Sequence, residues 1–246
     1  MTGLRIAFDL DGVLADLEEP YTAARLALFG SSSVPPSTGS AESAEEAESA
    51  EEAESVEEAG TDEDSRSKTS APRVRGLTRG QQSGVWKRIA RVPDFWTTLR
   101  PLEPRVVHGI QSLATRYRWH VFFVTQRPDT AGETTQRQTQ RWLIQQGFEL
   151  PAVIVMHGSR GRLAELLQLD VLVDDTPKHC VDVIAESKTR PMLVLRSGHA
   201  GTRSRAEGLG IQVVGSVREA LIALRQRSVP RIRPSLWQRL NRRVGR

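Results

Sequence analysis

The sequence is poor in cysteine and in long apolar runs, and both shortages exclude whole classes of protein. Cys180 is the only cysteine among 246 residues, so no internal disulfide can form and a reducing compartment is expected. No apolar run approaches the roughly 18 to 20 residues that a membrane-spanning helix needs. Asp9 and Asp11 interrupt the apolar N-terminal stretch, so it does not read as a secretory signal. These absences predict a soluble, cytoplasmic protein without a transmembrane segment.

Acidic residues are scarce outside one segment. Residues 41–64 hold 12 acidic residues and neither lysine nor arginine, which leaves 34 basic against 18 acidic residues in the rest of the chain. A basic body of this kind favours a phosphorylated or polyanionic ligand. An arginine-rich genome is the alternative explanation for the same composition.

The acidic segment is a repeat without an apolar face. Residues 41–58 read AESAEE, AESAEE and AESVEE, between flanks rich in serine, glycine and proline. Like charges at helical spacing repel, and so few apolar side chains cannot bury a core. The composition therefore predicts a disordered insertion over about 31–75. The insertion would either bind a basic partner through its acidic side chains or be a loop expansion without a function of its own.

The C-terminal end lacks acidic residues altogether. Eight arginines and no acid occupy residues 225–246. Prolines at 230 and 234 end the preceding helix, and apolar side chains then recur at helical spacing. We expect a basic tail over 227–246 that binds an acidic partner, nucleic acid or a membrane surface, or that docks on its own domain.

Short apolar strands alternate with helical patterns along the rest of the chain. Strands buried on both faces read as continuous apolar runs, and their alternation with helices is typical of a parallel sheet. The fold class predicted is therefore α/β, a Rossmann-like parallel sheet flanked by helices. The expected strands are 4–8, 119–125, 152–156, 170–174 and 191–195, and the expected helices are 104–117, 133–147, 160–168, 177–187 and 216–226.

Polar side chains follow three of these strands. Asp9 and Asp11 come after the first, Thr125 after the second, and Asp174 with Asp175 after the fourth. The carboxyl ends of parallel strands meet at one edge of the sheet, where ligands bind. Four carboxylates and a hydroxyl at one edge describe a site of oxygen ligands for Mg²⁺.

Three segments resemble the haloacid dehalogenase (HAD) superfamily. DLDGVLAD, VFFVTQRP and VLVDDTP are similar to its motifs one, two and four, in that order and each after a strand. The details look closest to the 5'(3')-deoxyribonucleotidases, and the resemblance covers residues 4–20 and 95–225. It implies a HAD-like core over 1–17 and 96–226, and a small helical cap inserted after the first strand, over 18–95.

The resemblance also implies roles. Asp9 would be the nucleophile and Asp11 the general acid and base. Mg²⁺ would bind through Asp9, the backbone carbonyl of Asp11, and the pair Asp174 and Asp175. The reaction implied is Mg²⁺-dependent hydrolysis of a small phosphate monoester, such as a (deoxy)nucleoside monophosphate, through an aspartyl-phosphate. The residues expected to hold the substrate are Thr125, Gln126, Arg127, Arg160 and Arg162.

One expected residue is missing. The family pattern places a lysine before the second acidic pair, and HGSRGRLAELLQLDVLVDD contains none. Arg160, Arg162 or Lys178 would have to replace its charge, and arginine is not an equivalent point charge. Two alternatives therefore stay open: a phosphatase for another small phosphate ester, or a catalytically weakened domain that serves as a binding module.

The remaining candidates have ordinary explanations. Trp86, Phe95 and Trp96 would either stack on a substrate base or form the core of the cap. The five histidines show no metal-ligand spacing and are expected to be structural or on the surface. Cys180 is expected in the core, and residues 196–204 are expected to form a surface loop.

Overall fold

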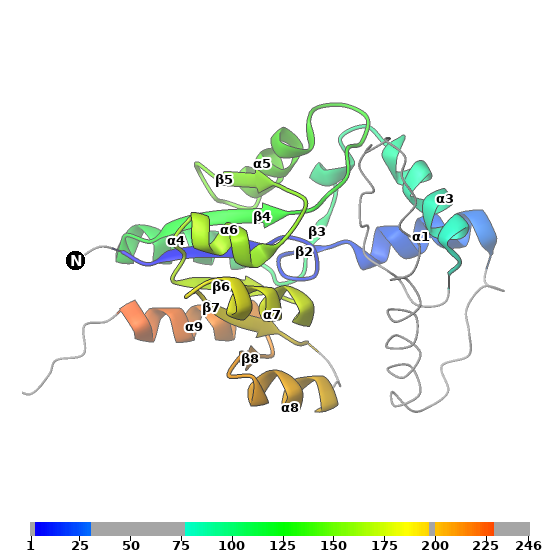
Figure 1. The fold of residues 1–246 in the computed structure, drawn as a ribbon. Helices are drawn as coiled ribbons and strands as arrows, with labels where there is room; N and C mark the ends of the chain where they lie inside the picture. The colour runs from blue at the N-terminus through cyan, green and yellow to red at the C-terminus, as the bar shows by residue number, and fades with distance from the viewer. Residues whose placement is uncertain (1–2, 31–76, 197–199, 229–246) are drawn as a thin grey trace, which may run out of the picture.

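The computed structural model describes residues 3–30, 77–196 and 200–228. Its centre is a parallel sheet of six strands in the order β5-β4-β1-β6-β7-β8 (Figure 1). The predicted α/β fold is thus confirmed, whereas the predicted acidic insertion and most of the basic tail lie outside the described residues. The strands are β1 Arg5–Asp9, β4 His120–Thr125, β5 Ala152–Val155, β6 Val171–Asp174, β7 Arg190–Val194 and β8 Gln212–Val214.

Helices cover both faces of the sheet because its strands are apolar on both faces. Ile6 and Phe8 of β1 pack into one core with helices α4, α5 and α9. Ala7 points the other way, into a second core with α6 and α7, and α8 extends that layer beside β7. The helices are α4 Val106–Tyr117, α5 Thr135–Gln145, α6 Arg160–Leu166, α7 Pro177–Glu186, α8 Ala200–Gly208 and α9 Val217–Ser228.

The predicted surface loop at 196–204 is wrong from residue 200 onward. Ala200–Gly208 form α8, which leads into β8. The helix has two glycines and little apolar character, so its sequence pattern is weak. Burial of Ala206 in a small core with Cys180 and Leu193 stabilises it instead. The same contact confirms that Cys180 is a core residue.

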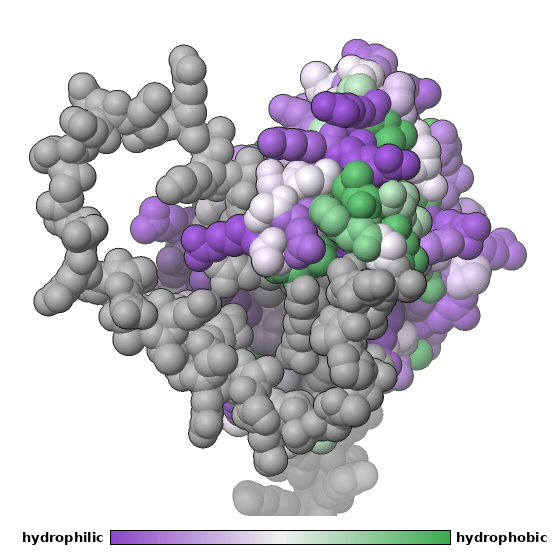
Figure 2. All heavy atoms as spheres, turned by 90° about the vertical axis from the view of Figure 1, so that its right-hand side faces the viewer, coloured by the Kyte–Doolittle hydropathy of each residue, from purple (hydrophilic) through white to green (hydrophobic). Residues whose placement is uncertain are grey.

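Two helices lie beyond the carboxyl edge of the sheet. Helix α1 (Glu18–Phe29) packs on α3 (Arg79–Ala90), and the rings of Tyr21 and Trp86 meet at 5.3 Å between them. A capping box between Thr78 and Gln81 begins α3. Seen from this side, the visible part of the described surface is mostly hydrophilic, and its hydrophobic residues gather mainly near the middle of the view (Figure 2).

Short elements join this pair of helices to the sheet. Strand β2 (Ala15–Asp16) pairs antiparallel with β3 (Arg100–Pro101), and the short helix η2 (Phe95–Thr97) contacts α5. Among the described residues, no helix combines the length and the apolar character that crossing a membrane requires.

Candidate active site

Two aspartates end neighbouring strands at the same edge of the sheet. Asp9 is the last residue of β1 and Asp174 the last of β6, and both are buried. Gly12 turns the backbone beside them with φ of +79°, and a Cβ at this position would collide with the carboxylate of Asp175. Glycine is therefore required here both for its positive φ and for the close approach to Asp175.

Arg160 lies between the two buried carboxylates. Its Nη2 donates to Oδ1 of Asp9 at 2.7 Å, and its Nε lies 3.7 Å from Oδ2 of Asp174. The guanidinium is almost fully buried, and its Nε and Nη1 have no hydrogen-bond partner among the described residues. A buried cation with unused donors faces the place where the two strands end.

The position of Arg160 follows from its helix. Ser159 caps α6 by accepting from the backbone N–H groups of Gly161 and Arg162, so Arg160 is its first helical residue. A Cβ on Gly161 would collide with the backbone carbonyl of Asp182 on α7. The glycine thus lets α6 and α7 pack closely, and this packing brings Arg160 to the sheet edge.

A second arginine, Arg127, is hydrogen-bonded to the carboxylate of Asp11. Arg127 donates from Nε and Nη2 to the Asp11 carboxylate at 2.9 and 2.7 Å. Its Nη1 donates to Oγ1 of Thr139 at 3.1 Å, and its guanidinium lies 4.7 Å from the ring centre of Trp96. The Arg127 side chain is fully buried, so it holds Asp11 rather than facing solvent.

His179 is a neighbour of the site that the sequence pattern did not reveal. Its Nδ1 lies 3.0 Å from Oδ2 of Asp174, and the backbone N–H of Thr176 donates to Oδ1 at 2.8 Å. His179 sits in the first turn of α7, five residues after Asp174. That spacing, with the helix beginning at Pro177, is the signal that could have pointed to it.

The other predicted site residues fall into two groups. Thr125 is buried at the end of β4, and its hydroxyl accepts from the backbone N–H of Arg127. Gln126 donates to the carbonyl of Gly158. Arg162 and Lys178 are exposed, and neither forms an ion pair within the described residues. The structure therefore gathers the aspartates with Arg127 and Arg160 and leaves Arg162 and Lys178 outside.

The three candidate stacking residues also separate. Phe95 and Trp96 are buried, and the indole N–H of Trp96 donates to the carbonyl of Pro128 at 3.0 Å. Both therefore belong to the core. Trp86 remains partly exposed on α3.

Solved structures resemble this architecture over almost the whole chain, although no family model and no curated protein matches the sequence. A HAD family hydrolase from Deinococcus radiodurans R1, solved with bound phosphate and sodium, aligns with 90% of this chain and 95% of its own at a TM-score of 0.51 and 14% identity. A haloacid dehalogenase-like hydrolase from Streptococcus pneumoniae aligns with 89% and 97%, at a TM-score of 0.51 and 12% identity. The fold is that of the HAD-like hydrolases.

Carboxylates crowd the strand ends of this HAD-like fold. Burial raises the pKa of Asp9 well above its ordinary value, and the charge of Asp174 adds to the shift while Arg160 opposes it. Burial and the charge of Asp174 also raise the pKa of Asp175 to about 7. Four carboxylates thus share two guanidiniums, and the site is short of positive charge.

The donor set fits a magnesium ion. No group of three or more His, Cys, Asp or Glu side chains in the described parts of the chain is arranged to enclose a metal. Mg²⁺ does not need one, because it keeps several waters and commonly binds through one or two carboxylates. The buried carboxylates of Asp9 and Asp174, with Asp175 beside them, are hard oxygen donors, and the single guanidinium of Arg160 is shared between Asp9 and Asp174.

The raised pKa of Asp175 predicts how the metal-free chain responds to pH. The folded state keeps a proton on Asp175 up to about pH 7, whereas the unfolded state loses it near 3.8. The folded state therefore binds more protons in this interval, and the free energy of unfolding falls as pH rises from about 4 to 7. Asp175→Asn should flatten this fall, as urea unfolding in EDTA would measure. If the free energy of unfolding of the variant fell with pH as steeply as that of the wild type, the pKa of Asp175 would not be raised in the folded state.

Proposed function

We propose that the chain is a Mg²⁺-dependent phosphatase that hydrolyses a small phosphate monoester through an aspartyl-phosphate on Asp9. The observation that carries the proposal is Arg160, whose guanidinium contacts both Asp9 and Asp174. It supplies the fixed positive charge that the missing lysine would have supplied. This contact favours an enzyme over a binding module that has lost its catalytic charge.

In the proposed reaction Asp9 is the nucleophile and Asp11 transfers the proton. An oxygen of Asp9 attacks phosphorus, an acyl-phosphate (a mixed anhydride) forms on Asp9, and the bond from phosphorus to the leaving oxygen breaks. Asp11 gives its proton to that leaving oxygen. Water then attacks phosphorus, Asp11 takes the proton from the water, and inorganic phosphate leaves with Asp9 restored.

A magnesium ion would be held by Asp9, Asp174, Asp175 and the backbone carbonyl of Asp11. When bound, it would supply the charge that lets a phosphate dianion approach a carboxylate. The hydroxyl of Thr125 and the backbone of Gln126 would hold the phosphoryl oxygens. Arg160 would add a charge-assisted hydrogen bond at the same place.

The substrate proposed is a (deoxy)nucleoside monophosphate, with α1 and α3 as the cap. The sequence resemblance supports this choice. So does Trp86 on α3, which lines a cavity of about 210 Å³ with residues 128–130, the segment that follows β4. Its indole N–H is buried and has no hydrogen-bond partner among the described residues.

A phosphatase screen tests the function. Nucleoside monophosphates should be hydrolysed with a higher kcat/KM than sugar phosphates, and EDTA should remove the activity. Trp86→Ala should raise KM for nucleotides and leave nitrophenyl phosphate unaffected, with Trp86→Phe as the control that keeps a ring. Equal rates for sugar phosphates would refute the nucleotide assignment, and no hydrolysis of any ester would refute the phosphatase.

Arg127 is expected to act by positioning Asp11. Arg127→Lys keeps the charge but cannot form the fork on the carboxylate, and misplacing a catalytic group by about 1 Å can cost roughly 10²-fold. Turnover of an alkyl phosphate should therefore fall by about that factor. The burst of nitrophenolate from nitrophenyl phosphate should change little, because this leaving group needs no proton. A burst reduced in equal measure would instead place Arg127 on the phosphate.

A further inference from the structure

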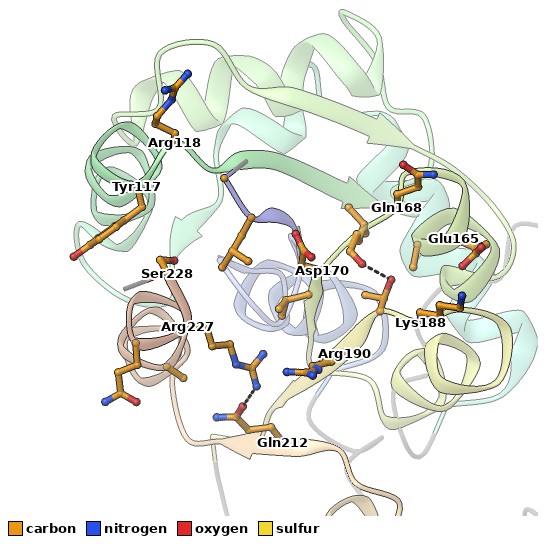
Figure 3. Close-up of a pocket in the computed structure, with 18 of the residues that line it drawn as sticks. Tyr117, Arg118, Glu165, Gln168, Asp170, Lys188, Arg190, Gln212, Arg227 and Ser228 are labelled. Carbon is orange, nitrogen blue, oxygen red and sulfur yellow. Dashed lines mark hydrogen bonds between the residues drawn. The ribbon is translucent and has the colours of Figure 1, made fainter. Parts of the chain in front are cut away.

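A large cavity in the described part of the chain lies at the edge of the sheet opposite the candidate active site. It has a volume of about 1420 Å³, and Figure 3 shows the residues that line it. Leu4, Val171 and Arg190, which line it, stand at the amino-terminal ends of β1, β6 and β7. Asp9 and Asp174 end two of these strands, so the cavity and the catalytic carboxylates are separated by the length of the sheet.

The cavity carries an excess of positive charge. Two acidic residues line it, and one of them, Asp170, already accepts a hydrogen bond from the backbone N–H of Arg5 at 2.7 Å. Five cationic residues line it: Arg116, Arg118, Lys188, Arg190 and Arg227. Their charges exceed those of Glu165 and Asp170 by three, so the lining attracts anions.

Two of the arginines face one another without a carboxylate between them. Figure 3 shows Arg227 extending from α9 and Arg190 from β7 toward the same part of the cavity. Arg227 donates to Oε1 of Gln212 at 2.7 Å, whereas the Arg190 side chain makes no ion pair or hydrogen bond within the described residues. Burial and the charge of Arg190 lower the pKa of Arg227, as expected for like charges that lack a counterion.

The segment that follows Ser228 in the sequence carries no negatively charged side chain that could neutralise these arginines. Ser228 lines the cavity, and residues 229–246, which continue from it, contain six arginines and no acidic residue. The nearest groups along the chain therefore carry the same sign of charge as the cavity.

We infer that this cavity is a binding site for a multiply charged phosphate anion, separate from the candidate active site. Arginine guanidiniums bind phosphate oxygens through paired, charge-assisted hydrogen bonds, and Gln212 adds an amide donor next to Arg227. Leu4, Leu169 and Ala223 give the cavity an apolar lining. Its volume exceeds what a small inorganic anion needs, so it admits an organic polyphosphate as well as an inorganic one.

Titration of the full chain with inorganic tripolyphosphate in EDTA tests the site, with ATP as a second arm. Backbone amide shifts in NMR spectra should move saturably at Leu4, Thr189 and Gln212. Arg190→Gln with Arg227→Gln should weaken this binding by about 100-fold or more, because each charged hydrogen bond that is lost is worth at least about a factor of ten. Arg203→Gln with Arg225→Gln removes the same charge from positions on α8 and α9 outside the cavity, and should change it less than about twofold.

The outcomes separate the possibilities. Tighter binding of ATP than of tripolyphosphate, despite its smaller charge, would show that the apolar lining contributes and that the ligand is organic; the reverse order would indicate an inorganic chain. Equal weakening by both double variants would reduce the effect to general charge attraction and overturn the site. The absence of saturable shifts at the cavity would overturn it too. Neither result depends on whether Asp9 is catalytic.

Discussion

Asp9→Asn is expected to abolish phosphoryl transfer and to leave the chain folded. An amide oxygen is too weak a nucleophile to form the acyl-phosphate, so activity should fall to the background rate. The fold should survive because burial and neighbouring carboxylates already disfavour the Asp9 charge, as the raised pKa shows. An asparagine can still accept the hydrogen bond from Arg160. Steady-state assays measure the loss of activity, and the Tm in EDTA measures whether the fold survives.

Asp11→Asn is the matched comparison, and it should behave differently. Asparagine cannot exchange the proton, but its backbone carbonyl is unchanged. Turnover should fall by roughly 10²- to 10⁴-fold, the contribution of general acid–base catalysis. If both variants kept full activity, the strand end after β1 would not be the catalytic centre.

Arg160→Met is expected to destabilise the metal-free chain by about 3 to 5 kcal/mol, the usual effect of removing one partner from a buried ion pair. The variant leaves Asp9 and Asp174 buried side by side without the guanidinium that contacts both. Arg160→Lys keeps a cation and should recover part of the stability and activity. Urea unfolding in EDTA at two pH values measures the effect.

The sign of the pH dependence is fixed by Asp9. Its pKa in the folded state is already raised, and it should rise further without Arg160. At pH 5 the folded variant can hold a proton there, so its loss of stability should be smaller than at pH 8. Arg162→Met, on the exposed face of the same helix, is the control and should stay within about 0.5 kcal/mol. An equal loss of stability in Arg160→Met and Arg162→Met would contradict the assignment of Arg160 as the partner of the buried carboxylates.

The sheet and the strand ends could be predicted because one physical rule governs both. Strands buried on two faces must be apolar throughout, so the first polar residue after each run marks its carboxyl end. The parallel register of β1 with β6 then places Asp9 beside Asp174.

The partners of the carboxylates could not be predicted from the sequence. The choice between Arg160 and Arg162 depends on which face of α6 turns toward the sheet, and the close packing at Gly161 decides that. Arg127 follows a strand and resembles a substrate ligand, but Asp11, Thr139 and Trp96 together bury it. These are tertiary contacts over more than a hundred residues in the case of Asp11, and no local pattern encodes them.

The same limit applies to His179 and α8. His179 shows no metal-ligand spacing, so only its place in the first turn of α7, five residues after Asp174, could have pointed to its contact with that carboxylate. Helix α8 has a weak sequence pattern and is stabilised by the burial of Ala206. In both cases the deciding contact comes from packing rather than from local propensity.

Mass spectrometry of acid-quenched protein tests the central claim most directly. The Asp11→Asn variant should react with nitrophenyl phosphate and Mg²⁺, because this leaving group needs no proton, and should then hydrolyse the intermediate slowly. The protein should gain one phosphoryl group, and digestion should place it on the peptide that contains Asp9. Asp9→Asn in the same background should gain none. Steady hydrolysis without any phosphorylated peptide, or a phosphoryl group on another residue, would contradict the account.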